Sequence, residues 1–191
     1  MNFIVWLHAV KQQLGLVFEI DPPEIDETPR HRENPLSYVQ RIAAAKADIV
    51  ALRHEQQCVI IAADTTVALD GEIFGQPRDL DEARRMIQKL SKKSHSVHTA
   101  VSVRCDGRSA NGLDTASVTM REVTPELLDW YLGTGESMGK AGAYAVQGQG
   151  AALVAEVRGE IDTVIGLPVW LLTERLAQIG VKLKDLQALS D

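Results

Sequence analysis

The segment VIIAADTTV, residues 59–67, constrains the fold most because five apolar residues lead directly into a carboxylate. An apolar run of this length, rich in β-branched residues, predicts a strand that is covered on both faces. A charge at the end of such a strand, here Asp64, is costly unless another group pairs with it. From the segment alone, Asp64 either caps a turn, which is the commoner role of such an aspartate, or belongs to a functional site.

Composition favours a cytoplasmic α/β protein. The chain of 191 residues allows one domain with a sizeable core, and Ala, Val, Leu and Ile dominate over the 5% of aromatic residues. The formal charge of −6 gives no basic surface for a nucleic-acid polymer, so a polyanionic ligand would need a local cluster of cations or a metal ion. Cys58 and Cys105 lie in strand-like segments and fit reduced core residues. No segment is apolar for long enough to span a bilayer, and residues 1–15 make a poor signal peptide.

Hydrophobic periodicity and capping signals predict the secondary structure. Asn34 followed by Pro35 predicts a helix start, and Gly180 predicts the end of the last helix. The expected elements, in order, are a strand over residues 16–20, a helix over 35–54, a strand over 58–64, a hairpin over 67–75, a helix over 79–91, two long strands over 95–123, a helix from 124 to about 133 and a helix over 168–180. This irregular alternation indicates an α/β fold with a mixed sheet.

Lys46 is a charged residue inside an apolar helix face. On a helical wheel it falls in the arc of Val39, Ile42, Ala43 and Val50. An ammonium group in that position either extends along the surface to reach water or meets an anion. If the helix borders a cleft, Lys46 can reach a phosphate or pair with the carboxylate of the following strand, whereas Arg41 lies on the opposite, polar side.

Two loops contain further candidate residues. Asp26 and Glu27 form a carboxylate pair, which is either solvated or available to a metal ion. The segment TGESMGKAGAYAVQGQG, residues 134–150, is either a tight connector or a ligand loop, because glycine lets backbone N–H groups approach a ligand closely. Within it, Gln147 offers both a donor and an acceptor, which suits the edge of a nucleobase.

Taken together, these segments resemble the Maf family of nucleoside triphosphate pyrophosphatases. The resemblance extends over nearly everything from Leu14 onward, with the motifs in the family's order and spacing. The segments that match are IDETP (25–29), YVQRIAAAKA (38–47), AADTTV (62–67), FGQPRDLDEAR (74–84), HSVHTAVSV (95–103), TGESMGKAGAYAVQGQG (134–150) and GEIDTVIGLP (159–168).

The resemblance implies a fold, a reaction and a cofactor. The fold would be an elongated mixed sheet flanked by helices, with two lobes around a cleft as in the inosine triphosphatase group, and residues 1–191 would form a single domain. Family members cleave a nucleoside triphosphate between its α and β phosphates, releasing a monophosphate and pyrophosphate. They need a divalent cation, Mg²⁺ or Mn²⁺, and are usually cytoplasmic homodimers, with no nucleic-acid polymer or membrane as a partner.

The resemblance also implies roles for individual residues. Asp64 corresponds to the catalytic base, with Lys46 and Glu27 as the other catalytic residues, and Asp64 and Glu27 would hold the metal. The form KAGAYAVQG is similar to the branch that prefers dTTP and UTP, in which Thr65 and Gln147 correspond to the residues that mark base specificity. A further alternative is the same reaction on a modified guanine nucleotide, and Gln147 argues against it.

Two departures from the family motifs predict reduced activity. The family's N-terminal Ser-x-Ser-Pro-Arg-Arg has no counterpart in residues 1–15, and Gln76 stands where the family has a lysine. The triphosphate would then be held by Lys46, the metal ion and backbone N–H groups of the glycine-rich segment. The alternative to a working enzyme is a catalytically impaired homologue that binds nucleotide or a protein partner.

Overall fold

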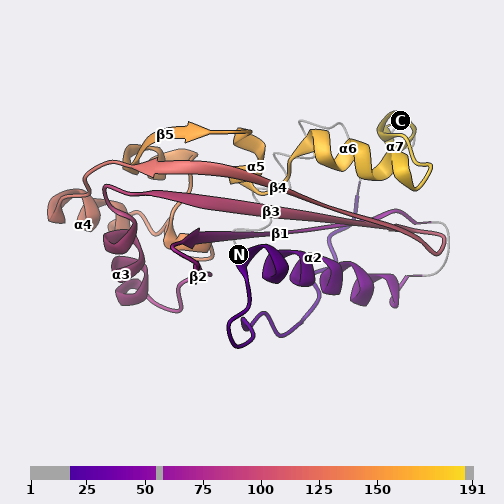
Figure 1. Ribbon diagram of the computed structural model, residues 1–191, viewed down its shortest axis with the longest axis horizontal. Coiled ribbons are helices and arrows are strands. Elements are labelled where there is room, and N and C mark those ends of the chain that lie inside the picture. The colour runs from indigo at the N-terminus through magenta and orange to yellow at the C-terminus, as the bar shows by residue number, and fades with distance from the viewer. Residues whose placement is uncertain (1–17, 55–57, 188–191) are drawn as a thin grey trace.

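The computed structural model of the chain describes residues 18–54 and 58–187, and it is elongated, with a sheet that follows its long axis (Figure 1). The strands are β1 (Ile60–Leu69), β2 (Glu72–Phe74), β3 (Ser94–Cys105), β4 (Arg108–Met120) and β5 (Val154–Arg158). The helices are α2 (Pro35–Ala51), α3 (Leu80–Leu90), α4 (Pro125–Gly133), α5 (Ile161–Ile165), α6 (Val169–Gln178) and α7 (Leu183–Gln187), with short 3₁₀ turns η1 (Ala141–Ala143) and η2 (Gly148–Leu153). The α/β class and the flanking helices are therefore confirmed.

The predicted caps and turns are confirmed in this structure. The Asn34 side chain accepts a hydrogen bond from the Leu36 N–H at the start of α2, and Gly180 follows α6 with a φ of 79°. The Asp70-Gly71 and Asp106-Gly107 pairs have positive φ angles at both residues, as type I′ hairpin turns require. In contrast, Phe18–Ile20 forms no strand. Phe18 instead packs beside the α6 core, and the rest of the expected strand, residues 16–17, lies outside the described residues.

The sheet has the order β2-β1-β3-β4-β5. Every strand pair among the described residues is antiparallel, so the parallel pair that a mixed sheet requires is not found there. The two tight hairpins explain this arrangement, because a two-residue turn can join only antiparallel neighbours. In the described chain β2 pairs with β1 only at residues 67–69, so residues 60–66 lie at an edge of the sheet.

Three core clusters position the helices on this sheet. At one end, α2 packs against the face that contains Ala100, whereas α6 packs against the opposite face through Val101 and Val103. At the other end, α3, α4 and the 3₁₀ turns enclose a core that contains Val67, Ile87 and Tyr131. Figure 1 shows the same division, with α3 and α4 at one end and α6 and α7 toward the other. This arrangement agrees with two lobes, and the cleft between them stays a prediction.

Candidate functional site

Asp64 lies within β1 and not at its end. It is the fifth residue of a ten-residue strand, Ile60–Leu69, because Thr65, Thr66 and Val67 are β-branched and continue the pairing with β3. The expected strand end at residue 64 is therefore wrong, and a turn cap is excluded. Asp64 is opposite Ala100, which faces α2, so its side chain projects toward that helix from the edge of the sheet.

Lys46 forms ion pairs with both candidate carboxylates, Asp64 and Glu27. Its Nζ lies 2.7 Å from Asp64 Oδ1 and 2.8 Å from Glu27 Oε1. The lysine side chain is 16% exposed and that of Asp64 10%, so Lys46 does not extend into water. The apolar residues Val39, Ile42 and Ala43 of the same helix are buried, as predicted, and they hold this helix face against the sheet. The anion-pairing alternative for Lys46 is thus the one that the structure adopts.

Burial sets the protonation of this cluster. Burial raises the pKa of Asp64 to about 6, with a smaller contribution from the nearby charge of Glu27, while Lys46 acts in the opposite direction. Burial alone would lower the pKa of Lys46, but the attraction and hydrogen bonds of Asp64 and Glu27 outweigh it, so the pKa lies above its ordinary value. At neutral pH the lysine is therefore charged and Asp64 is ionised, close to the pH at which it accepts a proton.

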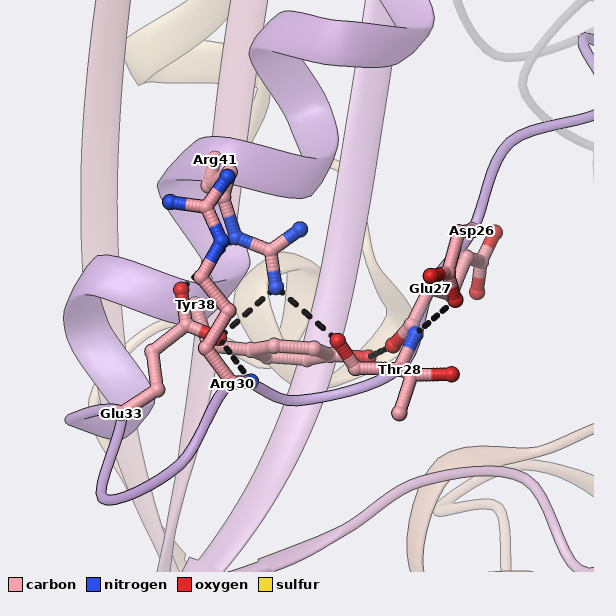
Figure 2. A network of polar contacts seen from close by, with 7 residues as sticks. All are labelled: Asp26, Glu27, Thr28, Arg30, Glu33, Tyr38 and Arg41. Carbon is pink, nitrogen blue, oxygen red and sulfur yellow. Dashed lines mark hydrogen bonds and ion pairs between the residues drawn. The ribbon is translucent and has the colours of Figure 1, made fainter.

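The loop that contains Glu27 is fastened to α2. The Tyr38 hydroxyl donates to the Glu27 carbonyl oxygen at 2.9 Å, and Arg41 Nη2 donates to the Thr28 carbonyl oxygen at 3.2 Å (Figure 2). The Thr28 N–H donates to Asp26 Oδ1 at 2.9 Å. Burial raises the pKa of Tyr38 to about 12, helped by the charges of Asp64 and Glu27, so the phenol keeps its proton and remains a donor. These contacts hold the Glu27 backbone beside the helix that carries Lys46, whereas Asp26 serves the loop itself.

Arg41 and Glu33 close the same loop, a contact that the sequence does not predict. Arg41 binds the Glu33 carboxylate through Nε and Nη2, both at 2.7 Å, and its guanidinium lies 5.6 Å from the centre of the Tyr38 ring. The Arg30 N–H also donates to Glu33, and the hydrogen bonds from Arg41, above all, lower the pKa of Glu33 to about 2. Figure 2 shows Arg41 between the two ends of the loop. The spacing of Tyr38 and Arg41, one helical turn apart, predicts the contact between these two side chains but not the position of the loop.

Thr65 points to the face opposite Asp64. Its hydroxyl lies 2.8 Å from the Thr99 hydroxyl, and Thr99 donates its single proton to the Thr163 carbonyl oxygen at 2.6 Å. Since a carbonyl can only accept, Thr65 must donate to Thr99, and toward any further partner Thr65 can only accept. The Thr163 hydroxyl in turn donates to Asp114. A Cβ on Gly166 would lie 3.0 Å from the Thr65 oxygen, so this hydroxyl is closely bordered by the end of α5.

Gln147 stands apart from the carboxylate–lysine cluster. It is exposed, directly before η2, and its side chain makes no hydrogen bond or ion pair with a described residue. The loop that contains it does reach β1 and β2, because the Gly142 N–H donates to the Gly75 carbonyl oxygen at 3.1 Å and a Cβ on Gly142 would lie 3.0 Å from Val67. Gln76, next to Gly75, is also exposed. The positions that would carry Ser-x-Ser-Pro-Arg-Arg lie outside the described residues.

The residues present fit a magnesium-type site better than a site made of protein ligands alone. Among residues 18–54 and 58–187, no group of three or more His, Cys, Asp or Glu side chains converges on one point. Asp64 and Glu27 nevertheless approach a single cation, the Lys46 ammonium. One or two carboxylates completed by substrate phosphates and water are the usual ligands of Mg²⁺.

No helix in the described part of the chain combines the length and apolarity that crossing a membrane requires.

Comparison with known proteins agrees with the geometry. A family model described as "Maf-like protein" matches residues 8–179. A protein of Anaeromyxobacter dehalogenans named "dTTP/UTP pyrophosphatase" is 46% identical over 176 residues, which cover 90% of this chain and 88% of that protein. Proteins with the same name from Myxococcus xanthus and Nitrosomonas europaea are 42% identical over 172 residues and 38% identical over 164 residues. The first of these two matches covers 90% of this chain and 86% of the relative, and the second covers 84% and 79%.

Proposed function

Because the chain belongs to the Maf family, we propose that it is a nucleoside triphosphate pyrophosphatase that hydrolyses dTTP and UTP to the monophosphate and pyrophosphate. The observation that carries this proposal is the cluster in which Lys46 Nζ lies within 2.8 Å of both Glu27 and Asp64. It combines a carboxylate with a pKa of about 6, which suits a general base, with a charged lysine that can compensate negative charge on a phosphate.

Asp64 would act as the general base. Water attacks the α-phosphorus, the bond from that phosphorus to the bridging oxygen of pyrophosphate breaks, and the proton of the water passes to the Asp64 carboxylate. In the metal-free cluster its raised pKa makes it a stronger base than an ordinary aspartate while leaving it ionised at neutral pH, and a bound cation would lower that pKa. Lys46 compensates the negative charge that develops on the phosphate oxygens, and the contacts of Tyr38 and Arg41 keep Glu27 beside it.

Asp64 and Glu27 would hold the divalent cation, Mg²⁺ or Mn²⁺, together with phosphate oxygens. A bound ion supplies positive charge to the phosphates and lowers the pKa of a bound water molecule. Lys46 Nζ contacts the same two carboxylates in the structure, so the lysine and the cation would share these ligands or the ammonium would move to a phosphate oxygen.

Thr65 supports the preference for uracil and thymine. Because it donates to Thr99, it can offer only an acceptor to a base, which matches the N3–H of uracil and thymine and not the unprotonated N3 of cytosine. Asp64 and Thr65 face opposite sides of β1. Residues 60–66 lie at an edge of the described sheet, so a nucleotide that contacts both residues would have to pass around that edge. Gln147 would complete the base site from the loop after η1.

We place the protein in the cytoplasm as a single-domain homodimer, following the family. The second candidate function is a homologue that binds nucleotide or a protein partner with little turnover. It is favoured by the neutral, exposed Gln76 and by the engagement of two N–H groups of the glycine-rich loop with a carboxylate of the protein itself. Both features remove expected contacts to the triphosphate.

Release of pyrophosphate from dTTP, UTP, CTP, ATP and GTP, measured with and without Mg²⁺ or Mn²⁺, tests the proposal. We expect metal-dependent release that is fastest with UTP and dTTP. An identically purified Lys46→Met variant serves as the control for contaminating phosphatase. Binding of UTP without release of pyrophosphate would favour the second candidate. Release that is equal in the two proteins and falls with further purification would come from a contaminant, whereas equal release that stays constant through further purification would refute the site.

A further inference from the structure

The segment after Tyr144 folds back on itself and presents Gln147 at its turn. Gly150 packs directly on the start of the segment, because a Cβ there would lie 2.3 Å from the Ala145 carbonyl oxygen. Gly148 has a φ of 66°, a conformation that favours glycine. Gln147 lies between Ala145 and Gly150, directly before Gly148, and is exposed.

Glu136 closes the other side of this turn. Its Oε1 accepts from the Gln149 N–H and its Oε2 from the Gly150 N–H, both at 3.1 Å. A Cβ on Gly148 would lie 2.7 Å from Oε1, so the carboxylate fills the space that a side chain would need. The Glu136 N–H donates to the Thr134 hydroxyl at 3.2 Å, and this bond fixes the backbone of Glu136.

The remaining anchors connect the turn to the strands of the site. Tyr144 is 5% exposed, and its hydroxyl lies 2.7 Å from His95 Nε2 on β3. On the N-terminal side, Gly142 is bonded to Gly75 and packs on Val67, three residues after Asp64 in β1. The segment from 142 to 144 is therefore fixed by the core, whereas the part that follows Gln147 is held by Glu136.

We propose that Glu136 is a positioning residue for base selectivity, because its carboxylate fixes the turn that holds Gln147 toward the nucleobase. The proposal rests on the proposed function, in which Gln147 contacts the base. A side chain that discriminates bases by hydrogen bonds must be held in place before the ligand arrives, since a mobile one adapts to the wrong base. Glu136 supplies this through two hydrogen bonds to an ionised acceptor.

The same geometry argues against a phosphate site at this turn. The N–H groups of Gln149 and Gly150 donate to the Glu136 carboxylate, so a phosphate would have to displace a side chain of the protein itself. The expectation that N–H groups of the glycine-rich segment hold the triphosphate therefore does not apply to these two. Their acceptor is Glu136, and their role is to hold the loop.

Glu136→Gln tests the proposal, with Glu122→Gln as the matched control. The amide keeps the size of the side chain but offers one oxygen and one NH₂ group, so one of the two backbone donors loses its acceptor. Glu122 is an exposed carboxylate paired with Lys92, and its change removes the same charge. We expect the ratio of kcat/KM for UTP to that for CTP to fall about tenfold in Glu136→Gln alone, the factor that 1.4 kcal/mol represents. Amide exchange of Gln149 and Gly150 should accelerate while Tm changes little.

A Gln147→Ala background separates positioning from general damage. If Glu136 acts through Gln147, adding Glu136→Gln to Gln147→Ala leaves the UTP-to-CTP ratio unchanged. An unchanged ratio in the single variant overturns the proposal, as does a uniform gain with every nucleotide, which would mean that Glu136 blocks a phosphate site. If Glu136→Gln does not fold, Glu136→Asp keeps the charge and shortens the reach, and faster exchange with an unchanged ratio overturns the proposal equally. A wild-type protein with no preference for UTP refutes the proposed selectivity instead, and the exchange rates still decide whether Glu136 holds the turn.

Discussion

Replacing Asp64 by asparagine should separate the chemistry of the site from its stability. Asparagine has nearly the same shape but cannot accept the proton of the attacking water. Removing a general base of this kind costs typically 10² to 10⁴ in rate, so we expect the pyrophosphatase activity of Asp64→Asn to be lost. The fold should persist, because the strand pairing of β1 with β3 extends from Ile60 to Ala68 and does not depend on the charge.

The effect on stability follows from the pKa of Asp64, which burial raises from 3.8 to about 6. A shift of this size, roughly two pKa units, corresponds to about 3 kcal/mol. Since the folded state holds this proton more tightly than the unfolded state, the favourable contribution is complete below about pH 4 and is lost as the pH rises through about 6. Asparagine imitates the protonated form, so the variant avoids the loss, and the attraction of Lys46 is already included in the shifted pKa.

Urea denaturation of both proteins at several pH values tests this reasoning. We expect equal free energies of unfolding near pH 4, and a variant that is more stable than the wild type by up to about 3 kcal/mol at pH 7.5. A variant that is less stable at pH 7.5 would show that the attraction between Asp64 and Lys46 exceeds the cost of burial. Retention of most activity by pure Asp64→Asn would remove Asp64 from the role of base.

Three further predictions concern two proposed substrate contacts and the loop that contains Glu27. Gln147→Ala should reduce the preference for UTP and dTTP over the other nucleotides, and equal turnover of ATP, GTP and UTP by the unmodified protein would contradict this role of Gln147. Gln76→Lys should raise kcat/KM for UTP by placing a cation at an exposed position beside the glycine-rich loop, and Gln88→Lys on α3 is the control for added charge. A wild-type turnover number already near 10 s⁻¹ would contradict the reduced activity that motivates this prediction. Arg41→Ala should lower kcat/KM by about ten- to a hundredfold by releasing the loop that contains Glu27, the range that charged hydrogen bonds of roughly 1.5–3 kcal/mol represent, and an unchanged value would refute the bracing role.

The sequence predicted helix limits, turns and the pairing of Lys46 with an anion better than it predicted the length of β1. Caps such as Asn34 and turns such as Asp70-Gly71 are local, and each follows from the backbone preferences of a few residues. Lys46 was predictable because a charge in an apolar helix face demands an explanation wherever the helix packs. The true length of β1 was missed because Asp64 is a poor strand residue by propensity, whereas the β-branched residues that follow it continue the pairing with β3.

The contacts of Arg41 show why the rest of the site could not be predicted from sequence. On the helix Arg41 lies away from the apolar face, and position alone places it in solvent. The loop of residues 26–33 covers that side of α2, and Arg41 then binds a carbonyl oxygen at one end of the loop and the Glu33 carboxylate at the other. Its function arises from where the loop lies, which no local pattern encodes. The position of Glu27, and with it half of the proposed metal site, therefore depends on a residue that the sequence assigns to the surface.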